Sequence, residues 1–308
     1  MSAIKDIRKR LELGLRLYYR SPWVRAPYTS AEAPIIVGGC DRSGTTLLRA
    51  TLDSHPDIAA GPESWVFVYK IKPDWLASEF GFEPSFVRSL MKESGSLAEF
   101  IDRFMDAYRK RENRPVWCEK SPRNILRLDW IWERFPKARV IHIVRDGRDV
   151  SCSLRNHPKR KRVGDAYVPT NINRPISRCI DHWIRYVSAG IQHRGDERYM
   201  EVRYEDLIAD YEATTKRICA HCNVEWSPAI LDRESRQQQR TDVEIVNPEV
   251  RQPLYQSAVS RWKRDLSADE QALCLRKAGH LLEAFGYLND QADEPEAPPR
   301  RVPEAVSS

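Results

Sequence analysis

The sequence predicts an α/β fold in which a central, mainly parallel sheet is flanked by helices on both faces. Residues 34–39 and 139–144 are short apolar runs rich in Ile and Val, which is typical of strands buried on both faces. A segment with helical character follows each of them, at 45–54 and 149–154. Strands that alternate with helices in this way usually form a parallel sheet, because each helix carries the chain back across it.

The remaining elements continue this alternation within one domain, which we place at residues 34–288. They are predicted at these positions: strands at 116–120 and 199–204, and helices at 75–110, 124–135, 176–190, 205–222 and 268–285. Gly286 is the expected C-cap of the last helix. Residues 155–175 are predicted to form a mobile basic loop, and residues 232–253 are polar and irregular.

Both ends of the chain are predicted to lie outside this domain, at residues 1–33 and 289–308. In residues 4–20 apolar side chains recur at three- and four-residue spacing among many basic ones, which predicts a basic amphipathic helix. This helix packs on the domain surface or makes peripheral contact with an anionic membrane, and the sequence leaves both open. Proline breaks make 21–33 a linker, and the Pro- and Glu-rich tail is predicted to be disordered.

Composition limits the classes of function. The 308 residues carry a net charge of +6, with 41% apolar and 31% charged residues, which is the usual mixture of a globular protein. We find no run of about 18 apolar residues that would span a membrane, and no secretory signal. The seven cysteines are an odd, scattered number, so we expect reduced thiols and a cytoplasmic location. The basic residues are not gathered in one tail, and we expect no nucleic-acid partner.

Residues 39–46 (Gly-Cys-Asp-Arg-Ser-Gly-Thr-Thr) form the most informative motif. Two glycines separated by four residues, between a buried strand and a helix, have the spacing and context of a phosphate-binding P-loop. Glycines let the backbone wrap around an anion, and free N–H groups at the start of the helix bind it. We therefore predict a P-loop-type central sheet. Its anion site would be formed by Arg42, Ser43, Gly44, Thr45 and Thr46.

The loop lacks the lysine of a nucleoside triphosphatase. Thr45 stands where that lysine would contact the β- and γ-phosphates, and the cationic residue is Arg42. The loop therefore suits an anion with less charge than a magnesium-bound triphosphate, and a 5′-phosphosulfate has this property. In the plainer alternative, the glycines serve only the turn between strand and helix.

Several segments, in order along the chain, resemble the P-loop sulfotransferases, most of all the tyrosylprotein sulfotransferases and their bacterial relatives. The resemblance extends from about residue 34 to 287. It depends on these segments: Val37 to Gly39, Arg42 to Leu47, Leu52-Asp53, His55-Pro56, Glu63, Glu119 to Pro122, Val144 to Val150 with Ser153, Tyr204 to Leu207, and Ser260 to Trp262. The segments around Arg42 and Arg145 are the most specific. Pro62 and Ser64 flank Glu63 differently from the tyrosine-specific enzymes, whose membrane anchor and paired secretory cysteines we do not find here.

The resemblance implies an enzyme that moves the sulfuryl group of 3′-phosphoadenosine 5′-phosphosulfate (PAPS) to an acceptor hydroxyl and releases adenosine 3′,5′-bisphosphate. It implies no metal. The acceptor would be a small molecule, a lipid, a glycan or a peptide tyrosine, and we expect its binding loops within 64–115 and 155–175. Aromatic residues at 65, 67, 69 and 75 line such a site or belong to the core, and the sequence leaves both open.

The resemblance also implies roles for individual residues in an in-line transfer. Glu63 would be the general base that takes the proton of the acceptor hydroxyl. Lys120, with Arg42 beside it, would stabilise charge on the bridging oxygen of the donor. Glu119 is a competing carboxylate, for which a structural role is expected because Lys120 is its neighbour.

A second group of residues is implied in donor binding. Arg145 and Ser153 would hold the 3′-phosphate, because Arg binds a phosphate through two N–H groups and Ser adds a donor. Tyr204, Ser260 and Trp262 would be further nucleotide contacts.

Other polar residues have plainer interpretations. Arg148 and Asp149 pair with each other or cap a helix. The basic run 159–162 is a solvated loop, a lid over the nucleotide or a grip on an acidic acceptor. Cys219 and Cys222 have no second pair of metal ligands near them in the sequence, and we expect them to pack in the core.

Two other classes of function remain. A P-loop kinase-like phosphotransferase would need Mg²⁺, and the missing lysine argues against it. A catalytically silent nucleotide-binding module would have no use for Glu63 and Lys120, and both are present. Affinity for adenosine 3′,5′-bisphosphate without turnover on a broad acceptor panel would favour the silent module.

Overall fold

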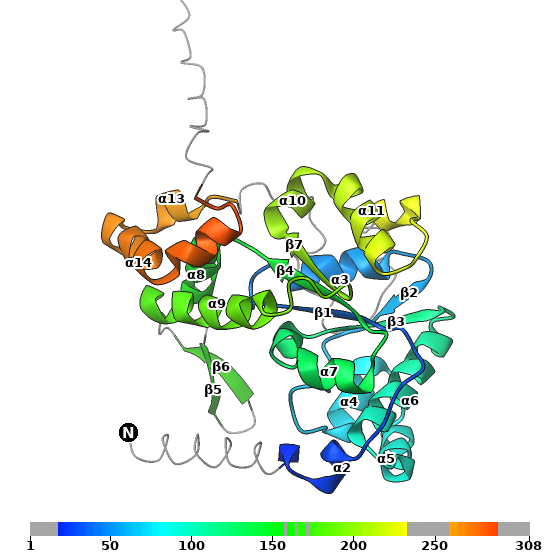
Figure 1. Cartoon of the computed structure of the whole chain (residues 1–308). Helices are drawn as coiled ribbons and strands as arrows, with labels where there is room; N and C mark the ends of the chain where they lie inside the picture. The colour runs from blue at the N-terminus through cyan, green and yellow to red at the C-terminus, as the bar shows by residue number, and fades with distance from the viewer. Residues whose placement is uncertain (1–17, 157–158, 164–165, 171–172, 233–258, 289–308) are drawn as a thin grey trace, which may run out of the picture.

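Five parallel strands in the order β2-β3-β1-β4-β7 form the central sheet of the computed structural model (Figure 1). The structure describes residues 18–156, 159–163, 166–170, 173–232 and 259–288. The strands of the sheet are β1 Ile35–Gly39, β2 Ile58–Ala60, β3 Val116–Lys120, β4 Arg139–Val144 and β7 Tyr199–Arg203. The predicted α/β fold with a parallel, helix-flanked sheet is confirmed.

Strand β1 lies in the middle of the sheet, which explains why its residues are all apolar or glycine and do not alternate with polar ones. It pairs in parallel with β3, where Ile35 lies opposite Cys118, and with β4, where Ile35 lies opposite Arg139. Every residue of β1 is buried. Ile36 packs into the core on one face of the sheet, while Ile35 and Val37 pack into the core on the other. Adjacent strand side chains point to opposite faces, so both faces need covering helices.

Helices cover both faces of the sheet (Figure 1). One core contains residues of α6, α7, α9 and α14, and the other contains residues of α3, α10 and α11. The helices in the described residues are α2 Pro22–Arg25, α3 Thr45–Asp53, α4 Pro73–Phe80, α5 Pro84–Glu93, α6 Leu97–Arg111, η1 Pro122–Leu126, α7 Leu128–Arg134, α8 Gly147–Asn156, α9 Ile176–Ile191, α10 Tyr204–Ala209, α11 Tyr211–His221, η2 Pro228–Leu231, α13 Trp262–Asp265 and α14 Ala268–Ala284.

Local signals in the sequence fix several helix ends. The N-cap Ser267 and Glu270 form a capping box at the start of α14, which satisfies two backbone N–H groups. The side chain of Ser96 accepts the N–H of Glu99 at 3.0 Å at the start of α6. The C-cap of α14 is Phe285, and Gly286, which was predicted for that place, follows it with a φ of 76°.

The segment predicted as a linker, 21–33, contains a short helix. Ser21 is the N-cap of α2 and accepts the N–H of Val24 at 3.4 Å. Val24 is buried in the core. The prediction was wrong here because Pro22 stands at the first position of the helix, where proline is tolerated.

The segment predicted as a mobile basic loop, 155–175, contains a two-stranded antiparallel sheet, β5 Lys159–Val163 and β6 Ala166–Thr170. Its register sets residue 163 opposite residue 166. The Gly-Asp dipeptide at 164–165 of the sequence is a hairpin signal that the prediction overlooked. The three-residue strand β2 was also missed, because it is too short to show a period.

Several predictions lie outside the described residues. These are most of the basic helix at 4–20, the polar stretch from 233 onward, and the tail at 289–308. Within the parts of the chain that the structure describes, no helix combines the length and the apolar character that crossing a membrane requires.

Candidate active site

The carboxyl ends of three neighbouring strands bring the predicted site residues to one edge of the sheet. β1 lies between β3 and β4 in the sheet, and all three run parallel. Lys120 ends β3, the glycine-rich loop 40–44 follows β1, and Arg145 follows β4. The carboxyl edge of an open parallel sheet is where ligands bind in folds of this kind.

The loop after β1 has the backbone of an anion-binding turn. Gly44 has a φ of 94° and precedes the first residue of α3, and a Cβ atom there would lie 2.5 Å from the ring of Tyr204. Arg42 has a φ of 72°, which costs energy for a residue with a side chain. Thr45 and Thr46 are the first residues of α3, and N–H groups at this end of a helix have no carbonyl partner inside the helix.

Ser43 lies inside this loop with its hydroxyl buried and without a hydrogen-bond partner among the described residues. A buried hydroxyl normally has a partner. An oxyanion bound by the loop would supply one. The residues present therefore fit a phosphate or phosphosulfate group.

The two predicted nucleotide segments meet through Arg42. Its Nε donates to the Oγ of Ser153 at 3.0 Å, and its carbonyl accepts from Nη1 of Arg145 at 3.2 Å. The Arg145 guanidinium also lies 4.8 Å from the centre of the Tyr204 ring. The structure thus brings together four residues that the sequence predicted as donor contacts, from the three segments that follow β1, β4 and β7.

Glu63 and Lys120 form an ion pair at the end of β3. Nζ of Lys120 donates to Oε1 of Glu63 at 2.5 Å. The Lys120 side chain is fully buried, while 21% of the Glu63 side chain is exposed. A buried cation next to a partly accessible carboxylate is an arrangement that can both stabilise charge and accept a proton.

Glu119, the competing carboxylate, has the predicted structural position. It is buried and accepts hydrogen bonds from Ser64 at 2.6 Å, from Ser121 at 2.7 Å and from Asn124. Burial raises the pKa of Glu119, and these hydrogen bonds oppose the rise. Glu119 is thus buried and links the loop after β2 to the segment after β3, which is consistent with a structural role.

A polar contact that the sequence analysis missed joins the loop to α9. Nε2 of His182 lies 2.8 Å from Oδ2 of Asp41, the residue before Arg42. Burial alone would raise the pKa of Asp41, but the hydrogen bond and charge of His182, with Arg123 and Arg174 nearby, hold it below its usual value. The two residues are 141 positions apart, so no local pattern connects them.

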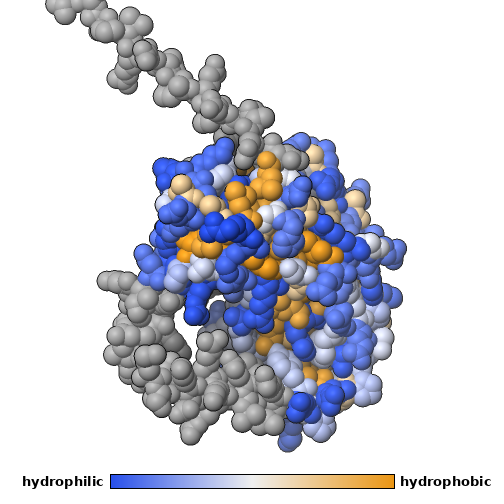
Figure 2. Space-filling view, turned by 60° about the vertical axis from the view of Figure 1, so that its left-hand side comes forward, coloured by the Kyte–Doolittle hydropathy of each residue, from blue (hydrophilic) through white to orange (hydrophobic). Residues whose placement is uncertain are grey.

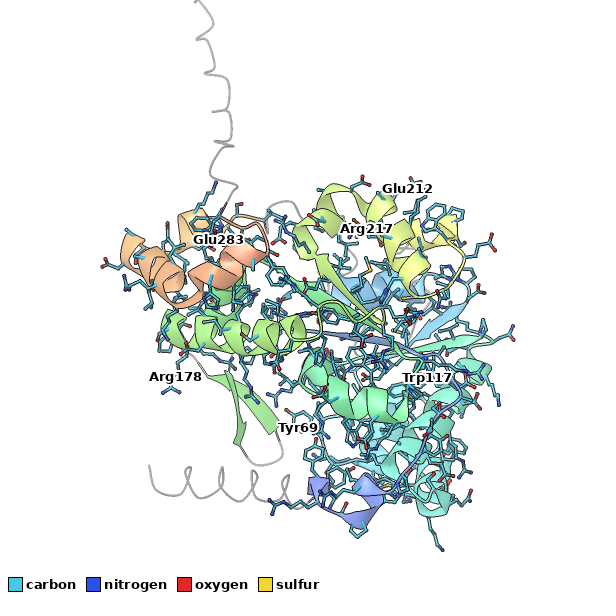
Figure 3. The ribbon with its side chains drawn as sticks, viewed as in Figure 1. Tyr69, Trp117, Arg178, Glu212, Arg217 and Glu283 are labelled. Carbon is cyan, nitrogen blue, oxygen red and sulfur yellow. The ribbon has the colours of Figure 1, made fainter. Side chains whose placement is uncertain are left out.

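Aromatic residues and an arginine surround this pair. The rings of His182 and Tyr186 are 4.6 Å apart, and the Arg123 guanidinium lies 5.2 Å from the centre of the Tyr69 ring. Asp41 and Arg123 lie close enough to both phenols to affect the pKa of each. We call Asp41, Tyr69, Arg123, His182 and Tyr186 the aromatic-arginine cluster; Figure 3 labels Tyr69, below the sheet.

The residues after Arg145 have different partners from those predicted. Arg148 pairs with Asp146, with Nη2–Oδ2 at 2.6 Å, and its guanidinium lies 3.7 Å from the centre of the Trp262 ring. Asp149 accepts the backbone N–H groups of Ser260 and Trp262, each at 2.9 Å. Arg148 and Asp149 therefore do not pair with each other, because Arg148 binds Asp146 and Asp149 binds the two backbone N–H groups.

The capping alternative is wrong for α8, because the side chain that accepts a backbone N–H at the start of this helix is that of Asp146, which accepts the N–H of Arg148 at 2.8 Å. Asp149 binds the N–H groups at the start of α13, a different helix from its own. Ser260 and Trp262, both predicted as nucleotide contacts, are consequently held against α8.

The remaining candidate ligands are structural. Cys219 and Cys222 are buried with free thiols, and burial raises the pKa of the Cys219 thiol to about 11. Burial lowers the pKa of His142 in β4 to about 3, and its Nδ1 lies 2.6 Å from the hydroxyl of Tyr199. Among the described residues, no group of three or more His, Cys, Asp or Glu side chains has the arrangement of a metal site.

Comparisons with known proteins point to one family. The Sulfotransferase family matches residues 34–228. The chain is 28% identical over 248 residues to the protein-tyrosine sulfotransferase of Drosophila melanogaster, over 77% of this chain and 48% of that protein. It is 29% identical to protein-tyrosine sulfotransferase 1 of Danio rerio, over 77% of this chain and 67% of that one. The chain thus spans about half the length of the Drosophila relative.

Solved structures agree on the fold. The sulfotransferase domain of the Synechococcus PCC 7002 olefin synthase superposes with a TM-score of 0.60 at 20% identity, covering 82% of this chain and 96% of that domain. The sulfotransferase domain from the curacin biosynthetic pathway gives a TM-score of 0.57 at 16% identity, covering 82% of this chain and 98% of that domain. The family match extends over more than half of the chain, from β1 to the start of η2. The chain belongs to the Sulfotransferase family.

Proposed function

We propose that this protein transfers a sulfuryl group from PAPS to an acceptor hydroxyl. The observation that carries the proposal is the junction of the two donor segments, where Arg42 contacts both Ser153 and Arg145. A loop without the P-loop lysine suits a 5′-phosphosulfate, and an adjacent Arg and Ser suit a 3′-phosphate. A nucleotide with phosphate groups at both positions fits this pair of sites better than ATP.

Donor binding is assigned to residues of three segments, which follow β1, β4 and β7. The backbone of the loop, with Ser43 and Thr45, would hold the 5′ end of the donor. Arg145 and Ser153 would hold the 3′-phosphate. The Tyr204 ring, which packs against both Gly44 and Arg145, keeps the loop and the arginine in a fixed relation.

The chemistry needs a base and a cation, and Glu63 and Lys120 supply them. Glu63 would accept the proton of the acceptor hydroxyl as its oxygen forms a bond to sulfur. Lys120 would donate to the bridging oxygen, which takes the electron pair of the breaking bond to sulfur. The 2.5 Å contact between the two side chains sets both groups at one place before substrates arrive.

The aromatic-arginine cluster is the acceptor side of this proposal. Asp41 belongs to the donor loop, and Arg123 follows the segment of Lys120 directly. Tyr69 belongs to the loop of Glu63, which is fixed to the end of β3 where the backbone N–H of Trp65 donates to Ser121 at 3.1 Å. The cluster is thus continuous in sequence with three of the groups assigned to the transfer.

The function is tested by incubating the full chain with PAPS labelled in its sulfuryl group and a panel of phenolic, sugar and lipid alcohols, without added metal. We expect the labelled sulfuryl group to appear in at least one acceptor, and we expect EDTA not to change the rate of this transfer. Phosphate transfer from labelled ATP that requires Mg²⁺ would contradict it and favour a kinase-like enzyme. Tight binding of adenosine 3′,5′-bisphosphate with no transfer to any acceptor would favour a silent module.

A further inference from the structure

The carboxylate of Asp149 holds a strained turn of the backbone. Its Oδ2 accepts the N–H of Ser260 and its Oδ1 accepts the N–H of Trp262, each at 2.9 Å. Ser260 has a φ of 58°, which residues with side chains rarely adopt. Such a conformation persists where the surroundings hold it. We call residues 260–262 the α13 turn.

The same side of α8 holds the α13 turn at a second point. The Arg148 guanidinium stacks on the Trp262 ring at 3.7 Å and is itself fixed by Asp146 and by the carbonyl of Tyr287, at 2.7 Å from Nη2. Figure 1 shows α13 beside α8. Two consecutive residues of α8 therefore bind the α13 turn.

Asp149 also lies next to the predicted 3′-phosphate site. It stands four residues after Arg145, and its Oδ2 is 3.9 Å from Nη2 of that residue. The same oxygen accepts from Ser260. One carboxylate thus contacts both Arg145 and the α13 turn, which come from segments more than 100 residues apart.

From these contacts we propose that Asp149 is a positioning residue for the donor, fixing the α13 turn and Arg145 relative to each other on two sides of the 3′-phosphate. This inference rests on the proposed function. It adds a residue that does not itself touch the nucleotide, and it makes the geometry of the 3′-phosphate site depend on a carboxylate.

The charge of Asp149 makes the proposal testable. A carboxylate close to a bound phosphate repels it, so an electrostatic role alone would weaken donor binding. Removing the charge would then tighten binding of a 3′-phosphate. If Asp149 acts by positioning, the same change weakens binding, because an Asn side chain offers one acceptor oxygen to two N–H donors and sets its own NH₂ group against one of them. The two roles predict opposite signs.

The test is calorimetric titration of Asp149→Asn with adenosine 3′,5′-bisphosphate and with AMP at pH 8. We expect the affinity for the bisphosphate to fall about tenfold or more, and the affinity for AMP to change less than about twofold. The matched control is Asp269→Asn, which removes a carboxylate from the exposed first turn of α14 and should change neither affinity. Unchanged or tighter binding of the bisphosphate by Asp149→Asn would overturn the proposal, as would equal weakening of both nucleotides.

A second variant tests the α13 turn if Asp149→Asn does not fold. Ser260→Pro removes one of the two N–H donors and cannot adopt a positive φ. Because α13 contains no buried residue, the core should remain folded. The affinity for the bisphosphate should again fall about tenfold, and the affinity for AMP should hardly change. If the variant still prefers the bisphosphate, the role of Asp149 is overturned, but the proposed function is not. A wild-type protein that binds both nucleotides equally would overturn the proposed function, and this inference with it.

Discussion

The donor side and the acceptor side of the site are built differently. On the donor side, the glycine-rich loop follows β1 directly and Arg145 follows β4 directly, while Ser153 lies farther along in α8. The acceptor side, the aromatic-arginine cluster, is drawn from the donor loop, the loop after β2, η1 and α9. The sheet fixes the position of groups at strand ends, whereas the positions of the residues in the aromatic-arginine cluster depend on how loops and a helix pack. The donor side should therefore tolerate changes in loops that the acceptor side does not.

The hydropathy of the surface does not distinguish the donor side from the acceptor side. Figure 2 shows a face on which hydrophilic residues surround an apolar band. Charged and apolar groups are mixed there, and colour by hydropathy alone does not separate a nucleotide site from an acceptor site. The two sides are distinguished by the contacts of particular residues.

The largest effect is expected where the two sides meet, at Glu63. Glu63→Gln keeps the size of the side chain but removes its ability to accept a proton, so the rate of sulfuryl transfer should fall roughly 10²- to 10⁴-fold. Affinity for adenosine 3′,5′-bisphosphate should stay within about twofold, which calorimetry would check. Glu119→Gln is the matched control, one residue from Lys120 on the same strand; it should lower thermal stability and leave the rate of the folded protein nearly intact. Near-normal transfer by Glu63→Gln would remove Glu63 as the base.

A smaller effect is expected for the donor side alone. Arg145→Ala removes the guanidinium assigned to the 3′-phosphate, and affinity for adenosine 3′,5′-bisphosphate should fall roughly 10- to 100-fold. AMP lacks that phosphate and should bind nearly as before. Competition titrations would compare the two nucleotides, and equal weakening of both would mean that Arg145 only supports the fold.

The acceptor side should respond in the opposite way. Arg123→Ala should raise the KM for the acceptor about tenfold while leaving nucleotide affinity nearly unchanged, because the Arg123 guanidinium stacks on the ring of Tyr69 in the aromatic-arginine cluster. Arg178→Ala is a suitable control: it is on α9, and Figure 3 shows Arg178 well away from Tyr69. Steady-state kinetics with both substrates varied would separate these effects. A change in nucleotide affinity with no change in acceptor KM would place Arg123 on the donor side.

The smallest effect concerns stability against pH. Burial raises the pKa of Asp149 from 3.8 to about 7, with Arg145 opposing and Asp146 and Glu205 reinforcing the rise. The folded state therefore binds this proton more tightly than the unfolded state, and the resulting stabilisation is complete below pH 3.8 and lost as the pH rises through about 7. The free energy of unfolding of wild type minus that of Asp149→Asn should decrease between pH 4 and pH 8 in urea titrations. A difference that stays constant over this range would show that Asp149 does not titrate there.

The same contrast explains how much could be predicted from the sequence. β1, its loop and α3 are contiguous, so spacing alone indicated both the fold and the anion site. Arg145 and Ser153 were assigned from the resemblance of the contiguous segment after β4, in which Arg145 follows the strand directly and Ser153 lies in α8.

What was missed depends on contacts across the chain. The pair of Asp41 and His182 joins residues 141 positions apart, and the bond from Ser260 to Asp149 joins residues 111 apart. Neither contact produces a periodic pattern or a short spacing that could be recognised in a single sequence. The hairpin of β5 and β6 did carry a signal, the Gly-Asp dipeptide, but the basic charge around it suggested a loop.

The most direct test of the central claim is calorimetric titration of the purified chain with adenosine 3′,5′-bisphosphate, AMP and ATP in the absence of Mg²⁺. We expect tight binding of the bisphosphate and at least about tenfold weaker binding of both AMP and ATP, because Arg145 and Ser153 are assigned to a 3′-phosphate that only the bisphosphate carries. Equal binding of all three nucleotides, or binding of ATP that appears only when Mg²⁺ is added, would contradict it.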